Sequence, residues 1–179
     1  RITGSNITIE GNGAVLAGNG IGATAAMVDI RGHDIIVRDL RLRNGGDNIR
    51  VQETGYNVVL SHLSSTGAAD DGISVGYGAH DVTIQWCFLA GNTRSIFLKE
   101  KTTRNISIHH TWIQKQWIRG PIVSTAVNAD VRNLMARSGR AVFGMGKAKG
   151  EHRITQALNY ALNSPFLSLS IQGARGILF

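Results

Sequence analysis

The chain has 179 residues, and its 19 Lys and Arg side chains outnumber its 12 Asp and Glu side chains to give a net charge of +7. This length suits one domain, or one and a fraction, with a sizeable core. The single cysteine, Cys87, excludes an internal disulfide framework. No apolar run reaches the roughly 18 residues of a membrane-spanning helix. Abundant glycine (22) and scarce proline (2) favour many tight turns between short strands.

The positive charge is concentrated toward the C-terminus. Residues 1–127 hold 12 Lys and Arg against 10 Asp and Glu, whereas residues 128–179 hold 7 against 2. Such a surplus can attract nucleic acid, acidic polysaccharide or anionic lipid, and it is also typical of an ordinary solvated basic face. We favour the solvated face and expect neither a nucleic-acid nor a membrane partner.

Two ladders of short apolar runs recur at nearly constant spacing over the first 125 residues. The runs of the first ladder open with an acidic or amide residue, at Asp34, Asn57, Asp81 and Asn105. The runs of the second ladder begin at Val28, Ile49, Ile73, Ile96 and Ile122. Two short strands per repeat of about 24 residues, joined by Gly- and Asn-bearing turns, predict an all-β solenoid, a parallel β-helix, over residues 5–125.

The pattern changes after about residue 127. The stretch "ADVRNLMARSG" predicts a short helix stopped by Gly139, and "RAVFGMG" predicts a strand. The stretch "GEHRITQALNYALNS" predicts an amphipathic helix, and "SIQGARGILF" a final strand. A solenoid coil cannot absorb this order of elements, so we predict a β-helix over 1–127 followed by a short α/β tail over 128–179.

A solenoid stacks equivalent positions of successive coils. Asp47, Asp71 and Arg94 each stand two residues before a second-ladder strand, with Asp70 beside Asp71 and Arg119 near the same place one coil later. Carboxylates from neighbouring coils form an oxygen-ligand site suited to Ca²⁺, and a cation would relieve the repulsion between the adjacent aspartates. Alternatively, Asp70 caps the turn by accepting hydrogen bonds from nearby backbone N–H groups.

Several phrases in the first 127 residues resemble the pectate lyase family of right-handed parallel β-helices, in its pectate/pectin lyase-like branch. They include "HDIIVRDLRLRNGGDNIRV", "DDGISVGYGAHDVTIQWCFLAGN", "NISIHHTWI" and "RGPIV", in the family's order. The family's N-terminal portion and later coils are missing, so the resemblance implies a β-helix truncated at both ends. It also implies calcium-assisted β-elimination of polygalacturonate, in which Ca²⁺ grips the uronate carboxylate and an arginine removes the C5 proton.

The resemblance assigns roles to five positions. Asp47 and Asp70 match two of the family's calcium carboxylates, and Asp71 stands where it can join them. Arg94 falls near the family's substrate-binding lysine, and Arg119 in "RGP" matches its catalytic arginine. These matches imply an acidic polysaccharide as substrate and Ca²⁺ as cofactor.

Three positions depart from the family pattern. Gly45 stands where a further calcium aspartate is usual, Ser74 occupies the next acidic position, and Ser124 replaces a second arginine. The sequence therefore leaves two functions open for the β-helix: a lyase with a reduced site, which is an enzyme only if that site is active, and a catalytically silent β-helix that binds acidic glycan or serves as a scaffold.

The tail resembles the C-terminal subdomain of the bacterial cell-division GTPase family FtsZ. The phrases "ADVR", "GMGKAKGEHR", "NSPFL" and "GARGILF" match in order, and Asp130 matches a loop aspartate that helps to hydrolyse GTP bound to a neighbouring subunit. The phosphate-binding loop and nucleotide-binding domain of that family have no counterpart here, because "GMGKAKG" lacks the G-K-[ST] ending. We therefore expect no nucleotide cofactor, and a third hypothesis is a cell-division fragment that docks onto filaments through its tail.

Two partial resemblances joined near "VNADVRN" indicate a chimera, whether natural, engineered or an error of assembly. The two relatives imply different compartments, export for the lyase-like part and the cytoplasm for the tail. Exposed coil edges predict self-association and poor solubility.

The remaining conspicuous side chains have structural interpretations. His62, His109 and His110 recur with the strand repeat, so we expect them in the wall or turns of the coils and not as catalytic bases. No spacing among them is typical of a zinc site. Cys87 and Trp86 are expected to pack on or in the coil wall.

Overall fold

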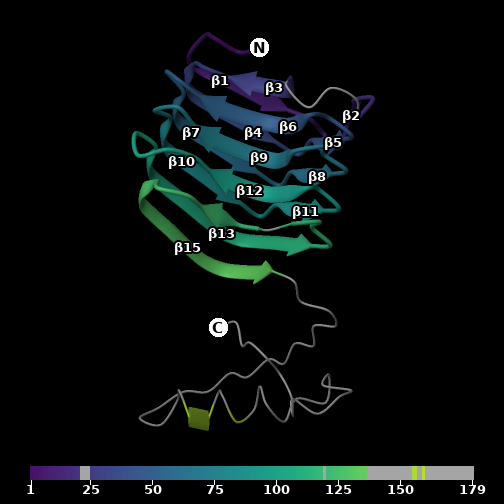
Figure 1. Cartoon of the computed structure of the whole chain (residues 1–179), viewed down its shortest axis with the longest axis vertical. Coiled ribbons are helices and arrows are strands. Elements are labelled where there is room, and N and C mark those ends of the chain that lie inside the picture. The colour runs from purple at the N-terminus through teal and green to yellow at the C-terminus, as the bar shows by residue number, and fades with distance from the viewer. Residues whose placement is uncertain (21–24, 119, 137–154, 157–158, 160–179) are drawn as a thin grey trace. The chain divides into compact units, whose positions relative to one another are not determined.

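The computed structural model describes residues 1–20, 25–118, 120–136, 155–156 and 159. The chain divides into two units, Arg1–Arg137 and Ser138–Phe179. In the first unit, parallel strands stack into a β-solenoid of about five turns (Figure 1). The predicted parallel β-helix is therefore confirmed.

Each coil contributes to three faces, one more than the two strands per repeat that the sequence predicted. The first face is built from the first ladder: β1 (Ile7–Glu10), β4 (His33–Arg38), β7 (Tyr56–Ser61), β10 (His80–Gln85), β13 (Arg104–Gln114) and β15 (Val127–Ala136). The additional face has strands of three residues: β2 (Val15–Ala17), β5 (Arg41–Arg43), β8 (Ser64–Thr66) and β11 (Phe88–Ala90). It is continued by the end of β13, which pairs with β11. The third face contains the second ladder: β3 (Ala26–Ile30), β6 (Asp47–Gln52), β9 (Asp71–Gly76), β12 (Arg94–Leu98) and β14 (Ile122–Val123).

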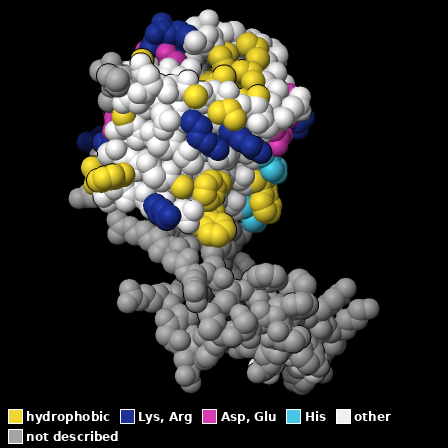
Figure 2. All heavy atoms as spheres, turned by 90° about the vertical axis from the view of Figure 1, so that its right-hand side faces the viewer, with side chains coloured by type: hydrophobic (Ala, Val, Ile, Leu, Met, Phe, Trp, Pro, Cys, Tyr) yellow, Lys and Arg dark blue, Asp and Glu magenta, His cyan; other side chains and the backbone are white. Residues whose placement is uncertain are grey.

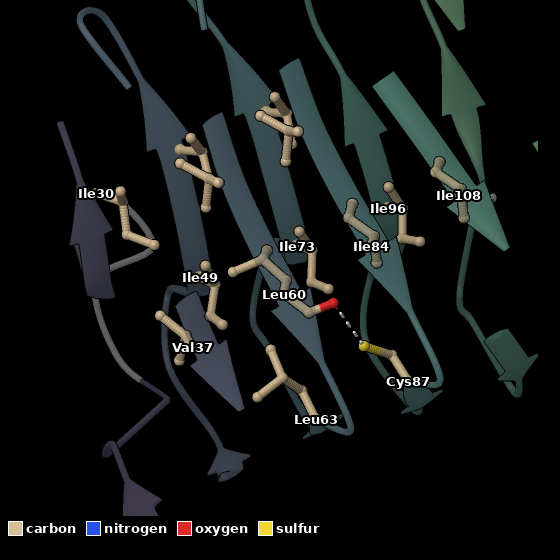
Figure 3. Close-up of a cluster of buried hydrophobic side chains, with 14 of the residues drawn as sticks. Ile30, Val37, Ile49, Leu60, Leu63, Ile73, Ile84, Cys87, Ile96 and Ile108 are labelled. Atoms are coloured by element: carbon tan, nitrogen blue, oxygen red, sulfur yellow. Dashed lines mark hydrogen bonds between the residues drawn. The ribbon is translucent and has the colours of Figure 1, made fainter. Parts of the chain in front are cut away.

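The core lies inside the coils and consists of columns of branched aliphatic side chains. Alternate residues of a strand point to opposite sides, so the apolar residue of each short run faces inward at the same register in every coil. Ile49 pairs with Ile73, which pairs with Ile96, and all three are fully buried. Figure 3 shows such residues from successive coils pointing into one interior, with the Cys87 thiol directed at the Leu60 carbonyl.

The second residue of β4, β7, β10 and β13 is an Asp or Asn with a left-handed backbone. The φ values are 55° at Asp34, 52° at Asn57, 52° at Asp81 and 57° at Asn105. Asp and Asn tolerate this conformation better than other non-glycine residues, which explains why the repeat selects them. The side chains also bond between coils, since Asn105 donates to Asp81 at 3.0 Å.

The helix predicted from "ADVRNLMARSG" is wrong. Residues 127–136 form β15, which runs parallel to β13 and pairs Ile106 with Ala129. Asn128 is the second residue of this strand and has a φ of 55°. Its side chain donates to Asn105 at 3.2 Å, which continues the contacts between the left-handed Asp and Asn residues of the earlier coils. Backbone pairing with β13 therefore overrides the helix propensity of the segment, and the first unit extends to residue 137, past the boundary predicted near 127.

Most of the predicted tail, including "RAVFGMG" and "SIQGARGILF", lies outside the described residues. Within the predicted helix over 150–164, the described residues Thr155, Gln156 and Asn159 are helical. No helix among the described residues is long and apolar enough to span a membrane.

Candidate functional site

The third face brings four of the predicted site residues together. Asp71 and Arg94 open adjacent strands and are paired in register. The Asp71 N–H donates to Oδ1 of Asp47 at 3.0 Å, so the preceding coil contributes a residue at the same position. Gly72 permits the close approach of the coil that carries Arg94, because a Cβ at position 72 would lie 2.6 Å from the side-chain amide nitrogen of Asn92 and 2.7 Å from the Ser95 carbonyl oxygen. Parallel register thus places Asp47, Asp71 and Arg94 one above another.

The three carboxylates form one compact cluster. Carboxylate oxygens of Asp47, Asp70 and Asp71 all lie within 4.8 Å of one another. Asp47 and Asp71 are fully buried, whereas the Asp70 side chain retains 31% of its exposure. Burial, and then the charge of Asp71, raise the pKa of Asp47, because both disfavour its ionised form.

Three cationic side chains of the chain itself balance this cluster. Nε of Arg94 donates to Oδ1 of Asp71 at 2.6 Å, and the same guanidinium bonds to Asp70. Arg50 donates to Oδ2 of Asp47 at 2.7 Å. The Lys99 ammonium lies 3.0 Å from Oδ2 of Asp71, an ion pair without hydrogen-bond geometry, since that oxygen accepts no hydrogen bond from the described residues.

Two of these cations lie over the same aromatic ring. The Arg94 guanidinium carbon is 4.8 Å from the Phe97 ring centroid, and the Lys99 ammonium is 4.9 Å from it. Burial alone would lower the pKa of Arg94, but its hydrogen bond to Asp71 and the nearby carboxylate charges raise it. Arg94 therefore stays charged, held by two carboxylates and a ring face.

The sequence did not identify Arg50 and Lys99 as members of this site. A partial signal for them existed in the repeat, because Arg50 follows the inward-facing Ile49 and Lys99 follows the inward-facing Leu98. Alternation along a strand predicts both side chains on the outward face, and their reach to the aspartates depends on their rotamers.

The cluster fits a bound calcium ion poorly as it stands. Calcium takes six to eight oxygen ligands. Arg94 instead directs N–H donors at Asp70 and Asp71, and Arg50 does so at Asp47. Three carboxylates face three cations, so a calcium ion would have to displace Arg94 before it gained the oxygens. Calcium binding stays a prediction that these contacts oppose.

The other positions that the resemblance singled out add no described side chain to the cluster. Arg119, the predicted catalytic arginine, lies outside the described residues, and its role stays a prediction. Gly45 leaves no room for the aspartate usual in the family, because a Cβ there would lie 2.7 Å from Met27 and 2.8 Å from Asn48. Ser74 is buried and paired with Arg50. Gly45 and Ser74 therefore supply no carboxylate, and the third carboxylate of the cluster is that of Asp71.

A shallow hollow of about 370 Å³ lies elsewhere, on the first face. Its lining includes Arg38, Ser61, His62 and Gln85 and none of the predicted site residues. Figure 2 shows a side of the molecule on which hydrophobic side chains form several small groups, with Lys and Arg side chains between them and histidine side chains against one group. The hollow is therefore distinct from the carboxylate cluster.

Two comparisons with known proteins bear on the chain. Residues 139–179 match the model of the FtsZ family, C-terminal domain. This match agrees with the predicted resemblance of the tail and does not reach the β-helix. A crystal structure of a "putative glycosyl hydrolase" from Parabacteroides merdae shares 14% identity with the chain and covers 76% of each chain, with a TM-score of 0.47. A superposition of this quality carries no information about activity.

Proposed function

We propose that the β-helix is a carbohydrate-binding module for acidic polysaccharide that does not carry out calcium-assisted elimination. The observation that carries this proposal is the charge balance of the cluster: Asp47, Asp70 and Asp71 are held by Arg50, Arg94 and Lys99. A cluster neutralised in this way offers little attraction to a divalent cation.

Arg94, Phe97 and Lys99 support the choice of ligand. Phe97 is partly exposed, and both cations lie over its ring. A uronate chain presents carboxylates that can share these cations and sugar C–H faces that can pack on the ring. The resemblance of the surrounding sequence to polygalacturonate-cleaving proteins points to the same class of ligand.

Calcium-assisted β-elimination is the second candidate. It is favoured by the three carboxylates whose oxygens lie within 4.8 Å of one another. In that mechanism, as the resemblance implies it, Ca²⁺ bound by the aspartates would acidify the C5 proton of a uronate. Arg94 would hold the substrate, and Arg119 would accept the proton.

One experiment on the full chain separates the two. Polygalacturonate is incubated with the protein at mildly alkaline pH in millimolar Ca²⁺, and unsaturated product is followed by ultraviolet absorbance. Binding of the same polymer is measured by calorimetry at low salt, with dextran as a neutral control. We expect no unsaturated product, and binding that weakens as salt is added because exposed charges are screened.

The variant Lys99→Met tests the placement of the binding surface. It removes one of the two cations at Phe97 and leaves the Arg94 contacts to Asp70 and Asp71 intact, so we expect weaker polygalacturonate binding with an unchanged fold. Appearance of unsaturated product would establish the second candidate, and absence of polygalacturonate binding at low salt would exclude the first.

A further inference from the structure

The corners of the β-helix bring neighbouring side chains together. At four positions where a residue is followed by a left-handed one, the tips of the two side chains come within hydrogen-bond distance. Four pairs share this geometry, with contact distances of 2.7, 2.7, 2.6 and 2.8 Å respectively: His33–Asp34, Ser61–His62, His80–Asp81 and His109–His110. The second residue of each pair has a φ between 50° and 55°. Adjacent residues of a straight strand point to opposite faces, and the left-handed φ removes that separation.

The fourth pair consists of two imidazoles. Nδ1 of His109 lies 2.8 Å from Nδ1 of His110, and the ring planes are 89° apart. A metal ion about 2.0–2.1 Å from each nitrogen, with a bond angle between square and tetrahedral, holds the two nitrogens about 2.9–3.4 Å apart. The two nitrogens therefore need to move apart by only a few tenths of an ångström. Loss of the shared proton and a turn of the two rings, so that both lone pairs point at one ion, would convert this hydrogen-bonded pair into a pair of ligands.

The surroundings leave this pair accessible and hold one ring in place. His110 is exposed and stacks on Trp86, with ring centroids 4.3 Å apart and planes 15° apart. Trp86 is itself 52% exposed. On the neighbouring strand, Arg132 is in register with His109, but its guanidinium is paired with Asp130 at 2.8 Å, which offsets its charge.

We propose that His109 and His110 form a two-imidazole site for a first-row transition-metal ion, with water in the remaining positions. Imidazole nitrogens suit Cu²⁺, Ni²⁺ and Zn²⁺, and the usual order of stability places Cu²⁺ first. The site is separate from the carboxylate cluster on the third face, and it rests on neither the proposed glycan binding nor calcium.

Cu²⁺ is the probe for this site. Titration of the full chain is followed by tryptophan emission, because a paramagnetic ion at His110 lies close to the Trp86 indole and quenches its share of the signal. Electron paramagnetic resonance at one equivalent counts the nitrogen ligands. We expect saturable quenching and a spectrum with two imidazole nitrogens.

Matched variants assign the ligands. His109→Asn keeps the His110–Trp86 stack and removes one ligand. Even outer partners of a ligand change metal affinity by about 10–100-fold, so we expect at least about a tenfold loss. His62→Asn removes the other histidine stacked near Trp86, 6.3 Å between centroids, and is expected to bind Cu²⁺ like the parent. Equal quenching of His109→Asn and the parent would overturn the proposal, as would a parent spectrum without nitrogen coupling.

A gain-of-function variant tests the corner geometry independently. Ser61→His places a second imidazole next to His62, where Ser61 Oγ and His62 Nδ1 now lie 2.7 Å apart. We expect this variant to bind a second equivalent of Cu²⁺. Unchanged stoichiometry in a folded variant would contradict the inference that the left-handed corner creates the site.

Discussion

Replacing Arg94 by methionine removes the cation shared by Asp70 and Asp71 and keeps an unbranched apolar stem in place of the arginine methylenes. Removal of one partner from a buried ion pair costs about 3–5 kcal/mol, because the other charge is left buried and uncompensated. Exposed pairs contribute only about 0–1 kcal/mol. The Arg94 side chain is 24% exposed and Asp71 fully buried. Lys99 stays 3.0 Å from Asp71. We therefore place the loss between these limits, at about 2–3 kcal/mol.

The assay is urea unfolding at neutral pH, with Arg38→Met as the matched control. Arg38 pairs with Glu10 on the first face, and the two side chains are 51% and 34% exposed. Because this pair is exposed, we expect Arg38→Met to lower the free energy of unfolding by less than about 1 kcal/mol. The double variant Asp71→Asn/Arg94→Met should lose about 1–2 kcal/mol less than the sum of the single variants, since both act on one pair. An Arg94→Met variant that is no less stable than Arg38→Met would refute this account of the cluster.

Three further predictions concern the pH dependence, the core and the thiol. The pKa of Asp47 is raised in the folded state, so ionisation of this carboxyl opposes folding. Its contribution to the free energy of unfolding is therefore greatest in acid and falls as pH rises through the folded-state pKa. Asp47→Asn should cost more stability in acid than at neutral pH, as measured by urea titration. Ile73→Ala should cost about 2–5 kcal/mol, because Ile73 is fully buried between Ile49 and Ile96 and the coils cannot collapse around the gap, and a loss of less than 1 kcal/mol would count against that packing. Burial raises the pKa of the Cys87 thiol to about 12, so a thiol reagent should label Cys87 at pH 8 only in denaturant, and rapid labelling of the native chain would show that the thiol is exposed.

The sequence predicted the solenoid because its periodicity is set by backbone geometry. Asp34, Asn57, Asp81 and Asn105 recur where each coil needs a left-handed residue, and the inward apolar residues recur with them. The strands of the additional face were missed because runs of three residues, such as Arg41–Arg43, carry no detectable alternation. β15 was misread as a helix, although Asn128 follows Asn105 at the repeat distance, because "VRNLMA" favours helix locally while β13 offers it a pairing edge.

The candidate site could be predicted as a location but not as a charge arrangement. The equal spacing of Asp47, Asp71 and Arg94 from the second-ladder strands predicted that these residues lie one above another, since the register between coils follows from the repeat. It could not show that Arg94 bonds to the aspartates and that Lys99 lies against Asp71, because those contacts depend on rotamers. The meeting of His109 and His110 likewise depends on one left-handed φ that an isolated sequence does not reveal.

The central claim is that guanidinium and ammonium groups of the chain, and not a metal ion, neutralise the three carboxylates. Thermal unfolding of the unmodified chain in millimolar Ca²⁺ and in chelator tests it most directly, because a ligand that binds only the folded state raises the midpoint, and the rise continues with the logarithm of ligand concentration above the Kd. The account predicts the same midpoint in both solutions. A midpoint that rises steadily with Ca²⁺ concentration, and that Asp71→Asn abolishes, would contradict it.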